Sequence, residues 1–174
     1  LEASGQAENT IIAFTSDHGE MGGSHGLTAK GVLYEEAVRI PMLLRVPWRH
    51  SRQILVKQPV SHIDVVPTLL EAMGTGNPGN LPGESLLPLA EGKVRADPHV
   101  VIEWNQPLSR AVISPDGWKM ALLEKDNCLL FDRNRDPLEQ NNLFYRGESA
   151  AVIRRLRGAL EKWQQRTRDG ARFA

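Results

Sequence analysis

The chain has 174 residues, with 21 basic and 21 acidic side chains, 41% apolar residues and one cysteine. This length is typical of one domain with a sizeable core. Zero net charge argues against a nucleic-acid partner, which requires a basic surface. No apolar run approaches the roughly 18 residues of a membrane span, so we expect no membrane partner. The single cysteine excludes an intrachain disulfide and a zinc site built from cysteines.

The start of the chain suggests a longer protein. The first residue is Leu1 rather than methionine, and Leu1 to Gly5 resemble the last turn of a helix with a glycine cap. No signal peptide is visible. We therefore expect the chain to begin partway through a protein, and either a cytoplasmic or a periplasmic location is compatible with it.

The first half predicts an incomplete α/β layer. Residues 10–15 form a β-branched apolar run typical of a strand that is buried on both faces of a parallel sheet. Polar residues 16–19 follow it, at the strand end where open α/β sheets bind ligands. Further strands are predicted at 42–46 and 54–56, and a helix at 64–74.

The second half has a different pattern. Four short strand-like runs lie close together at residues 99–104, 110–113, 118–123 and 128–131, which predicts an antiparallel meander. A helix at 149–168 has apolar positions spaced for one face. The predicted fold class is α/β, with residues 1–96 as one domain and residues 97–174 as a small antiparallel sheet covered by a C-terminal helix.

Asp17 and His18 form the leading candidate metal site. A carboxylate and an imidazole at a strand end can bind one divalent cation, and oxygen ligands favour calcium, magnesium or manganese. Gly19 allows the backbone to turn beside the ion. The alternative is that Asp17 caps a turn and His18 is simply exposed.

His25 and Lys30 lie in the glycine-rich loop that follows. Lys30 could place a positive charge on a substrate anion, or it could be an ordinary solvated lysine. His25 could be a general acid, a partner of another site residue, or a turn residue. Cys128 lies in an apolar run without a cationic neighbour, which favours a packed thiol over a nucleophile.

Taken together, residues 10–47 resemble the sulfatase family of the alkaline-phosphatase-like superfamily. Asp17 and Lys30 are also separated by the 13 positions found in that family. A later stretch, with Leu130-Phe131-Asp132, Asp136-Pro137, Glu139 and Asn142-Leu143, resembles its C-terminal signature. The matching segments of the first stretch are Phe14-Thr15-Ser16-Asp17-His18-Gly19-Glu20, His25-Gly26, Lys30, Tyr34-Glu35-Glu36 and Val38-Arg39-Ile40-Pro41.

The resemblance implies a fold and a chemistry. The fold would be part of an alkaline-phosphatase-like sandwich, and the reaction would be hydrolysis of a sulfate ester. Asp17 and His18 would be ligands of a divalent metal ion, usually calcium, with magnesium or manganese as alternatives. Lys30 would contact the sulfate group or the leaving-group oxygen. Many relatives have asparagine at the position of His18, and histidine is common in the branch that includes phosphonate monoester hydrolases.

The family nucleophile is missing from the sequence. It lies upstream in a Cys/Ser-x-Pro-x-Arg motif, where it becomes formylglycine, and neither Cys128 nor Ser114 has this context. The paired upstream aspartates are also missing. We therefore expect a C-terminal fragment of a sulfatase that is inactive alone and that associates with its N-terminal segment or forms a homo-oligomer. The alternatives are a phosphate or phosphonate ester hydrolase, and a non-catalytic remnant that binds anions or a partner.

Overall fold

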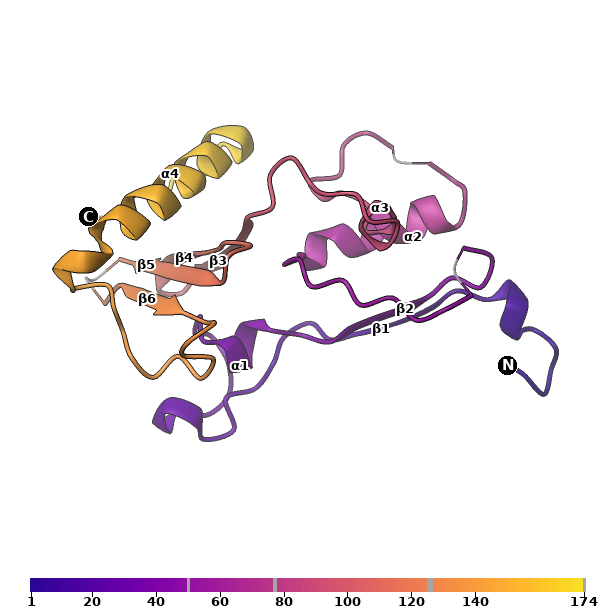
Figure 1. Cartoon of the computed structure of the whole chain (residues 1–174), viewed down its shortest axis with the longest axis horizontal. Coiled ribbons are helices and arrows are strands. Elements are labelled where there is room, and N and C mark those ends of the chain that lie inside the picture. Colours follow the sequence, from indigo (N-terminus) through magenta and orange to yellow (C-terminus); the bar gives the residue numbers. More distant parts are fainter. Residues whose placement is uncertain (50, 77, 125–126, 174) are drawn as a thin grey trace. The chain divides into compact units, whose positions relative to one another are not determined.

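The computed structural model describes residues 1–49, 51–76, 78–124 and 127–173. These residues form two compact units, which are described separately (Figure 1). The first unit contains residues 1–19 and 39–96, and the second contains residues 20–38 and 97–174. The chain therefore leaves the first unit after Gly19 and returns to it at Arg39. The family-based division at residue 96 stays a prediction.

The first unit has a two-stranded sheet and short helices around a small core. Strand β1 pairs antiparallel with β2. The core consists of Val46, Ala72 and Leu87, with Ile11 and Leu44 packed against it. The elements are the 3-10 helix Ala7–Asn9, β1 Ile12–Thr15, β2 Met42–Arg45, the 3-10 helix His62–Asp64, α2 Val65–Ala72 and α3 Leu87–Ala90.

Two predictions for this unit are wrong. Strand β1 is not in a parallel sheet, because its neighbour β2 runs antiparallel. It is also not buried on both faces, since Ile12 is 41% and Phe14 58% exposed. Residues 54–56 form no strand. An apolar run shows that a segment favours burial, but it does not show which partner provides the cover.

A buried carboxylate organises the second half of this unit. Asp64 accepts hydrogen bonds from the backbone N–H groups of Ser61, at 2.8 Å, and Glu84, at 3.0 Å. Arg95 lies 2.8 Å from the same carboxylate. Gly83 is required beside it, because a Cβ atom there would lie 2.1 Å from the Ile63 carbonyl oxygen. The loop before α3 is thereby held against the start of α2.

The second unit confirms the predicted meander and terminal helix. Its four strands are antiparallel in the order β3-β4-β5-β6. The elements are the 3-10 helix Ser24–Gly26, α1 Glu35–Val38, β3 Val100–Asn105, β4 Leu108–Ile113, β5 Trp118–Leu123, β6 Leu129–Asp132, the 3-10 helix Gly147–Ser149 and α4 Ala150–Thr167.

Both faces of this sheet are covered. On one face, α4 contributes Leu156 and Leu160 to a core with strand residues such as Met120. On the other face, Leu33 and Val38 pack against the small side chains Ala111 and Ala121, together with other apolar residues. The helix was predicted, but the cover provided by residues 20–38 was not. The alternation of side chains along a strand brings Leu122 to the first face and Ala121 to the second.

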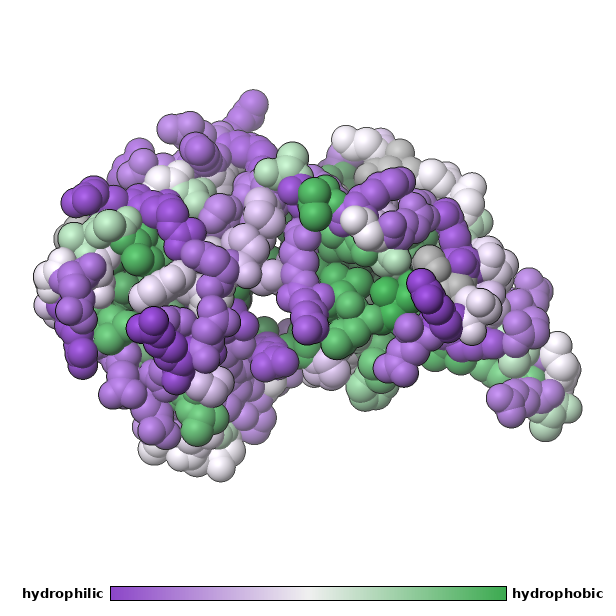
Figure 2. Space-filling model, viewed as in Figure 1, coloured by the Kyte–Doolittle hydropathy of each residue, from purple (hydrophilic) through white to green (hydrophobic). Residues whose placement is uncertain are grey.

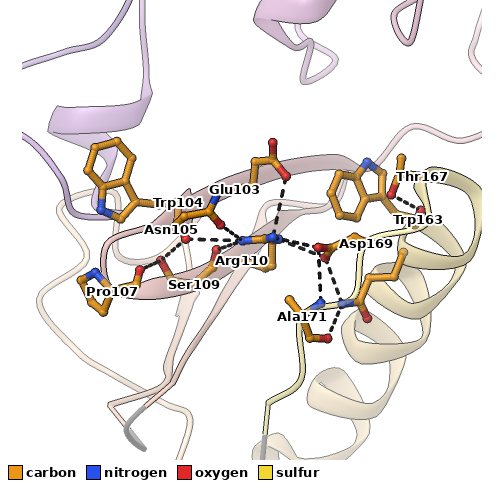
Figure 3. A network of polar contacts seen from close by, with 11 residues as sticks. Glu103, Trp104, Asn105, Pro107, Ser109, Arg110, Trp163, Thr167, Asp169 and Ala171 are labelled. Atoms are coloured by element: carbon orange, nitrogen blue, oxygen red, sulfur yellow. Dashed lines mark hydrogen bonds and ion pairs between the residues drawn. The ribbon is translucent and has the colours of Figure 1, made fainter.

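An ion pair ties the C-terminal end to the sheet (Figure 3). Arg110, on β4, donates from Nη2 to Asp169 Oδ1 at 2.8 Å and from Nε to Asp169 Oδ2 at 3.1 Å. Its other nitrogen donates to the carbonyl oxygens of Trp104 and Ser109 and to the side-chain oxygen of Asn105. The two charged side chains are only 4% and 11% exposed. The hydrogen bonds from Arg110 hold the pKa of Asp169 below its ordinary value, although desolvation acts in the opposite sense.

Replacement of this carboxylate is expected to destabilise the second unit. Asp169→Asn leaves the buried Arg110 charge with the exposed Glu103, 3.8 Å away, as its acidic neighbour, which costs about 2–4 kcal/mol of unfolding free energy at pH 7. In the parent chain, the contribution of Asp169 is complete above its unfolded pKa and is lost as pH falls through its lower folded pKa. The difference between the two proteins should therefore shrink in acid, as measured by urea unfolding between pH 7 and pH 2.5.

The matched control is Asp116→Asn. Asp116 forms a similar two-bond pair with Arg155, but the two side chains are 52% and 44% exposed. An exposed pair contributes about 1 kcal/mol or less. Equal losses in the two variants would contradict the role given to Asp169.

No helix in the described part of the chain is long and apolar enough to cross a membrane.

Candidate functional site

The end of β1 brings Asp17 and His18 together. His18 Nε2 lies 3.3 Å from Asp17 Oδ2, and the Asp17 side chain is 80% exposed. The other carboxylate oxygen accepts hydrogen bonds from the His18 backbone N–H, at 3.0 Å, and from the Ser16 hydroxyl, at 3.3 Å. Desolvation raises the pKa of Asp17, but the hydrogen bonds to its carboxylate and the electrostatic interaction with His18 together lower it more, so that the pKa lies below its ordinary value.

The geometry of this pair suits a divalent cation. Two ligands at right angles, each about 2.4 Å from one ion, would lie about 3.4 Å apart, close to the separation of Oδ2 and Nε2. His18 Nδ1 lies 2.6 Å from the Gly19 carbonyl oxygen, so it carries the proton and donates it there. Nε2 is then the ring nitrogen beside Asp17, and a metal-binding histidine usually donates its other ring N–H to a carbonyl or carboxylate oxygen in this way.

These two side chains alone would not complete a metal site. Calcium binds 6–8 oxygen ligands, according to its ordinary coordination. No group of three or more histidine, cysteine, aspartate or glutamate residues with metal-site geometry occurs within the described ranges. The residues present would therefore fit a cation as two of its ligands, with the remaining ligands still to be supplied.

Residues 21–29 form a closed loop in the second unit. The Met21 backbone N–H donates to the Ala29 carbonyl oxygen at 2.9 Å, and Gly23 N–H donates to the Leu27 carbonyl oxygen at 2.9 Å. The Met21 side chain is only 2% exposed and anchors the loop. The loop thus has a defined conformation, although its sequence suggested only glycine-rich irregular structure.

His25 is stacked within this loop. Its ring lies 3.9 Å from the Tyr34 ring, centroid to centroid, with an interplanar angle of 15°. Nε2 lies 3.9 Å from Glu36 Oε2, a solvent-shielded atom without a hydrogen bond within the described residues. A pocket of about 370 Å³ adjoins these side chains and is also lined by Ser24, Leu138 and Gln140. This setting favours the reading of His25 as a partner that shapes the loop, and its predicted catalytic role stays a prediction.

Lys30 lies between two residues with left-handed backbone. Ala29 has φ of 62° and Gly31 has φ of 97°. A Cβ atom on Gly31 would lie 3.4 Å from Cζ2 of Trp104, so the chain passes close to this ring. Left-handed conformation is unfavourable for alanine, and such strain is concentrated at functional sites.

The predicted site residues occupy different units. Asp17 and His18 belong to the first unit, whereas His25 and Lys30 belong to the second. Each pair is described separately, and the roles given to all four residues stay predictions. Cys128 is 5% exposed in the core under α4, in agreement with a packed thiol.

A buried ion cluster next to the Lys30 loop was not predicted. Lys119, on β5, lies 2.9 and 3.0 Å from the two carboxylate oxygens of Glu139 and 3.1 Å from Glu35. Burial raises the pKa of Glu139, although the Lys119 charge opposes this shift. One sequence signal could have indicated a buried ion pair, because Lys119 is a charged residue inside the apolar run 118–123.

The architecture agrees with that of known hydrolases of the alkaline-phosphatase-like superfamily. A solved structure of BT4656, in complex with its substrate D-glucosamine-2-N,6-O-disulfate, is 30% identical with a TM-score of 0.81, covering 98% of this chain and 37% of that one. The phosphonate monoester hydrolase of Agrobacterium radiobacter is 26% identical with a TM-score of 0.77, covering 97% of this chain and 37% of that one.

The sequence comparison identifies the family. The family described as N-sulphoglucosamine sulphohydrolase, C-terminal, matches residues 23–166. The uncharacterized sulfatase YidJ of Escherichia coli K12 is 35% identical over 177 residues, covering 94% of this chain and 34% of YidJ. The chain therefore belongs to the sulfatase family and corresponds to its C-terminal part, as its sequence predicted. It spans about a third of the length of these relatives.

Stability measurements can test the constrained backbone around Lys30. Gly31→Ala forces a side chain into the left-handed region beside Trp104 and should cost about 1–2 kcal/mol. Ala29→Gly should change stability by less than about 0.5 kcal/mol, because relief of strain offsets the greater freedom of glycine in the unfolded chain. Urea unfolding would measure both.

Gly147→Ala is the control, since a Cβ there meets nothing within 4 Å and its φ is outside the left-handed range. A Gly31→Ala variant as stable as Gly147→Ala would show that Gly31 is not required.

Proposed function

We propose that this chain forms the metal-binding and leaving-group side of a sulfate ester hydrolase, and that a nucleophile-bearing N-terminal portion completes the active site. The observation that carries the proposal is the Asp17–His18 pair at the end of β1, in a chain that belongs to the sulfatase family. The portion that completes the site would contain the formylglycine and the remaining metal ligands.

Asp17 and His18 are the two metal ligands that this chain supplies. Calcium is the expected ion, with magnesium and manganese as alternatives. A bound divalent cation would neutralise negative charge on the sulfate oxygens. The hydrogen bond from His18 Nδ1 to the Gly19 carbonyl oxygen keeps Nε2 available as a ligand. The two hydrogen bonds to Asp17 Oδ1 leave Oδ2 as the oxygen that faces His18.

Lys30 is proposed to stabilise the negative charge that develops on the transferred group or the leaving oxygen. A lysine ammonium is a compact point charge, which suits sulfate oxygens. A charge that is already in place costs no reorganisation during the reaction. The left-handed residues on both sides of Lys30 restrict its backbone and so favour a fixed position.

The exposed apolar surface of the first unit is consistent with an interface to a partner. Figure 2 shows hydrophobic surface in the region of β1, β2 and α2. An exposed apolar area of this kind usually marks an interface, and it argues against a self-sufficient non-catalytic remnant. We propose that the N-terminal portion covers it, with a second copy of this chain as the alternative. The exposed apolar side chains of this unit include Ile12, Phe14, Leu43, Leu55, Ile63, Val66 and Met73, which are 41–77% exposed.

A second candidate function is hydrolysis of phosphate or phosphonate esters. His18 favours it, because histidine at this position is common in the branch that includes phosphonate monoester hydrolases. The structural similarity to the Agrobacterium radiobacter enzyme agrees with this alternative. Sulfate and phosphonate monoesters present similar tetrahedral oxygens to a cation and a lysine, so relative rates must decide.

The test uses this chain alone and fused behind the part of YidJ that precedes the matched region. The fusion is expected to hydrolyse 4-nitrophenyl sulfate and to lose activity in EDTA, whereas the 174 residues alone are inactive. Asp17→Ala and Lys30→Ala should each lower kcat/KM at least about 100-fold, which is typical for loss of a key electrostatic group. His18→Asn should retain activity, since an amide oxygen can replace the imidazole.

Asp116→Asn, far from these residues in sequence and exposed, is the control for nonspecific effects. Metal-dependent turnover by the isolated chain, or an Asp17→Ala fusion with full activity, would contradict the proposal. A faster rate with 4-nitrophenyl phenylphosphonate than with the sulfate would favour the second function. Light scattering of the isolated chain distinguishes a dimer from a monomer.

A further inference from the structure

Four charged side chains form a closed cluster between the Lys30 segment and the sheet. Lys119 Nζ lies 3.1 Å from Glu35 Oε1 and 2.9 Å from Glu139 Oε1. Arg133 Nη2 lies 3.4 Å from the other oxygen of Glu35. The Glu35 backbone N–H also donates to Glu139 Oε2 at 2.9 Å. Two positive and two negative charges therefore balance within the cluster.

The cluster is deeply buried. Lys119 is 1% exposed and Glu139 is 0% exposed, while Glu35 is 12% and Arg133 24% exposed. Removing these groups from water is costly, and buried ion pairs often contribute no more stability than apolar residues of similar volume. The stability of the sheet therefore does not explain the cluster well. The ion cluster is better explained by a role in fixing how the segments that it joins are placed relative to one another.

The segments joined are distant in sequence. Glu35 is at the start of α1, and its side chain and backbone reach residues 84 and 104 positions away. Apolar contacts also join residues 20–38 to the sheet, such as those of Leu33 with Ala111 and Ala121. Apolar contacts have no preferred direction, whereas charge-assisted hydrogen bonds do. The ion cluster thus defines the register of this segment on the sheet.

The segment needs such a restraint because its backbone is strained. Ala29, immediately before Lys30, has φ of 62°. A strained residue keeps its conformation only where the surrounding structure holds it. Gly31, packed near Trp104, holds the segment at a second point just after Lys30.

We infer that Lys119 and its partners Glu35 and Glu139 are positioning residues for Lys30, which hold the loop that carries this lysine in one register. The catalytic part of this inference depends on the function proposed for Lys30. The part that concerns the placement of residues 20–38 depends only on the contacts described above. The two parts can be tested separately.

The first test measures amide hydrogen exchange in the 174-residue chain. Glu35→Ala removes the side-chain link and keeps only the backbone N–H hydrogen bond of residue 35 to Glu139. Lys119 stays paired one to one with Glu139, and the charge that loses its partner is Arg133, which is 24% exposed. Residues 20–38 should lose roughly tenfold or more of their protection, while β3–β6 keep theirs, because local opening is separate from global unfolding. A second variant, Lys119→Met combined with Glu139→Gln, removes the central pair without leaving a net charge and should act similarly.

Leu160→Ala is the matched control, since it destabilises the core under α4 without touching residues 20–38. It should lower the urea midpoint and the protection of the whole second unit. If Glu35→Ala gave this uniform pattern, or no change, the inference would be overturned.

The second test measures kinetics in the fusion with the YidJ N-terminal portion. Glu35→Ala should lower kcat by roughly 10- to 100-fold with little change in KM, as expected for a misplaced catalytic group. Combined with Lys30→Ala, it should add little further loss, because both changes remove the same contribution. Glu35→Gln should recover part of the rate, and Leu160→Ala should leave kcat unchanged at a temperature where it is folded.

These results separate the two proposals. Unchanged kcat in Glu35→Ala, or full additivity with Lys30→Ala, would overturn the positioning role while the proposed function stands. A fusion inactive in every form would count against the proposed function, and the exchange pattern would still decide whether the cluster places the loop.

Discussion

The sheet β3–β6 has two apolar faces, and most features of the second unit follow from the need to cover both. Helix α4 covers one face with Leu156 and Leu160. Residues 20–38 cover the other, where Ala111 and Ala121 leave room for Leu33. Since this cover comes from an early stretch of sequence, the chain has to leave the first unit after Gly19 and return at Arg39. The same excursion carries His25 and Lys30.

The family signature near the C-terminal end has mainly structural tasks in this chain. Asn142 accepts from the Leu130 backbone N–H and donates to the Cys128 carbonyl oxygen, and so continues the hydrogen bonding of β6. Asp136 accepts hydrogen bonds from the backbone N–H groups at positions 140 and 141. Glu139, in a left-handed conformation, reaches Lys119. These residues hold together the part of the second unit against which the Lys30 segment packs, a role that does not require contact with a substrate.

The sequence predicted the local structure of this protein better than its long-range contacts. Alternation and turn residues located β3 to β6, and apolar spacing located α4, because these signals act between near neighbours. The adjacent pair Asp17 and His18 was likewise visible, since a bend at Asp17 suffices to bring the side chains of these two neighbours together. The antiparallel pairing of β1 was missed, because an apolar run does not specify its partner strand.

The contacts of Glu35 with Lys119 and Glu139 were missed for a related reason. None of these three charged residues differs in the sequence from an ordinary exposed charge, and they come together only after the sheet has formed. His25 shows the same limit, because its stacking on Tyr34 depends on the closed loop that residues 21–29 form.

The discontinuous second unit also has a consequence for the order of events during synthesis. Residues 20–38 leave the ribosome well before β5, whose last residue is Leu123. At about 5–20 residues per second, the intervening 85 positions take roughly 4–17 s. Throughout this interval Leu33 and Val38 have no complete sheet to cover, whereas the residues of the first unit are all made once Ala96 has been added. The segment that carries Lys30 is thus among the first parts of this chain to be synthesised and among the last that can reach its native contacts.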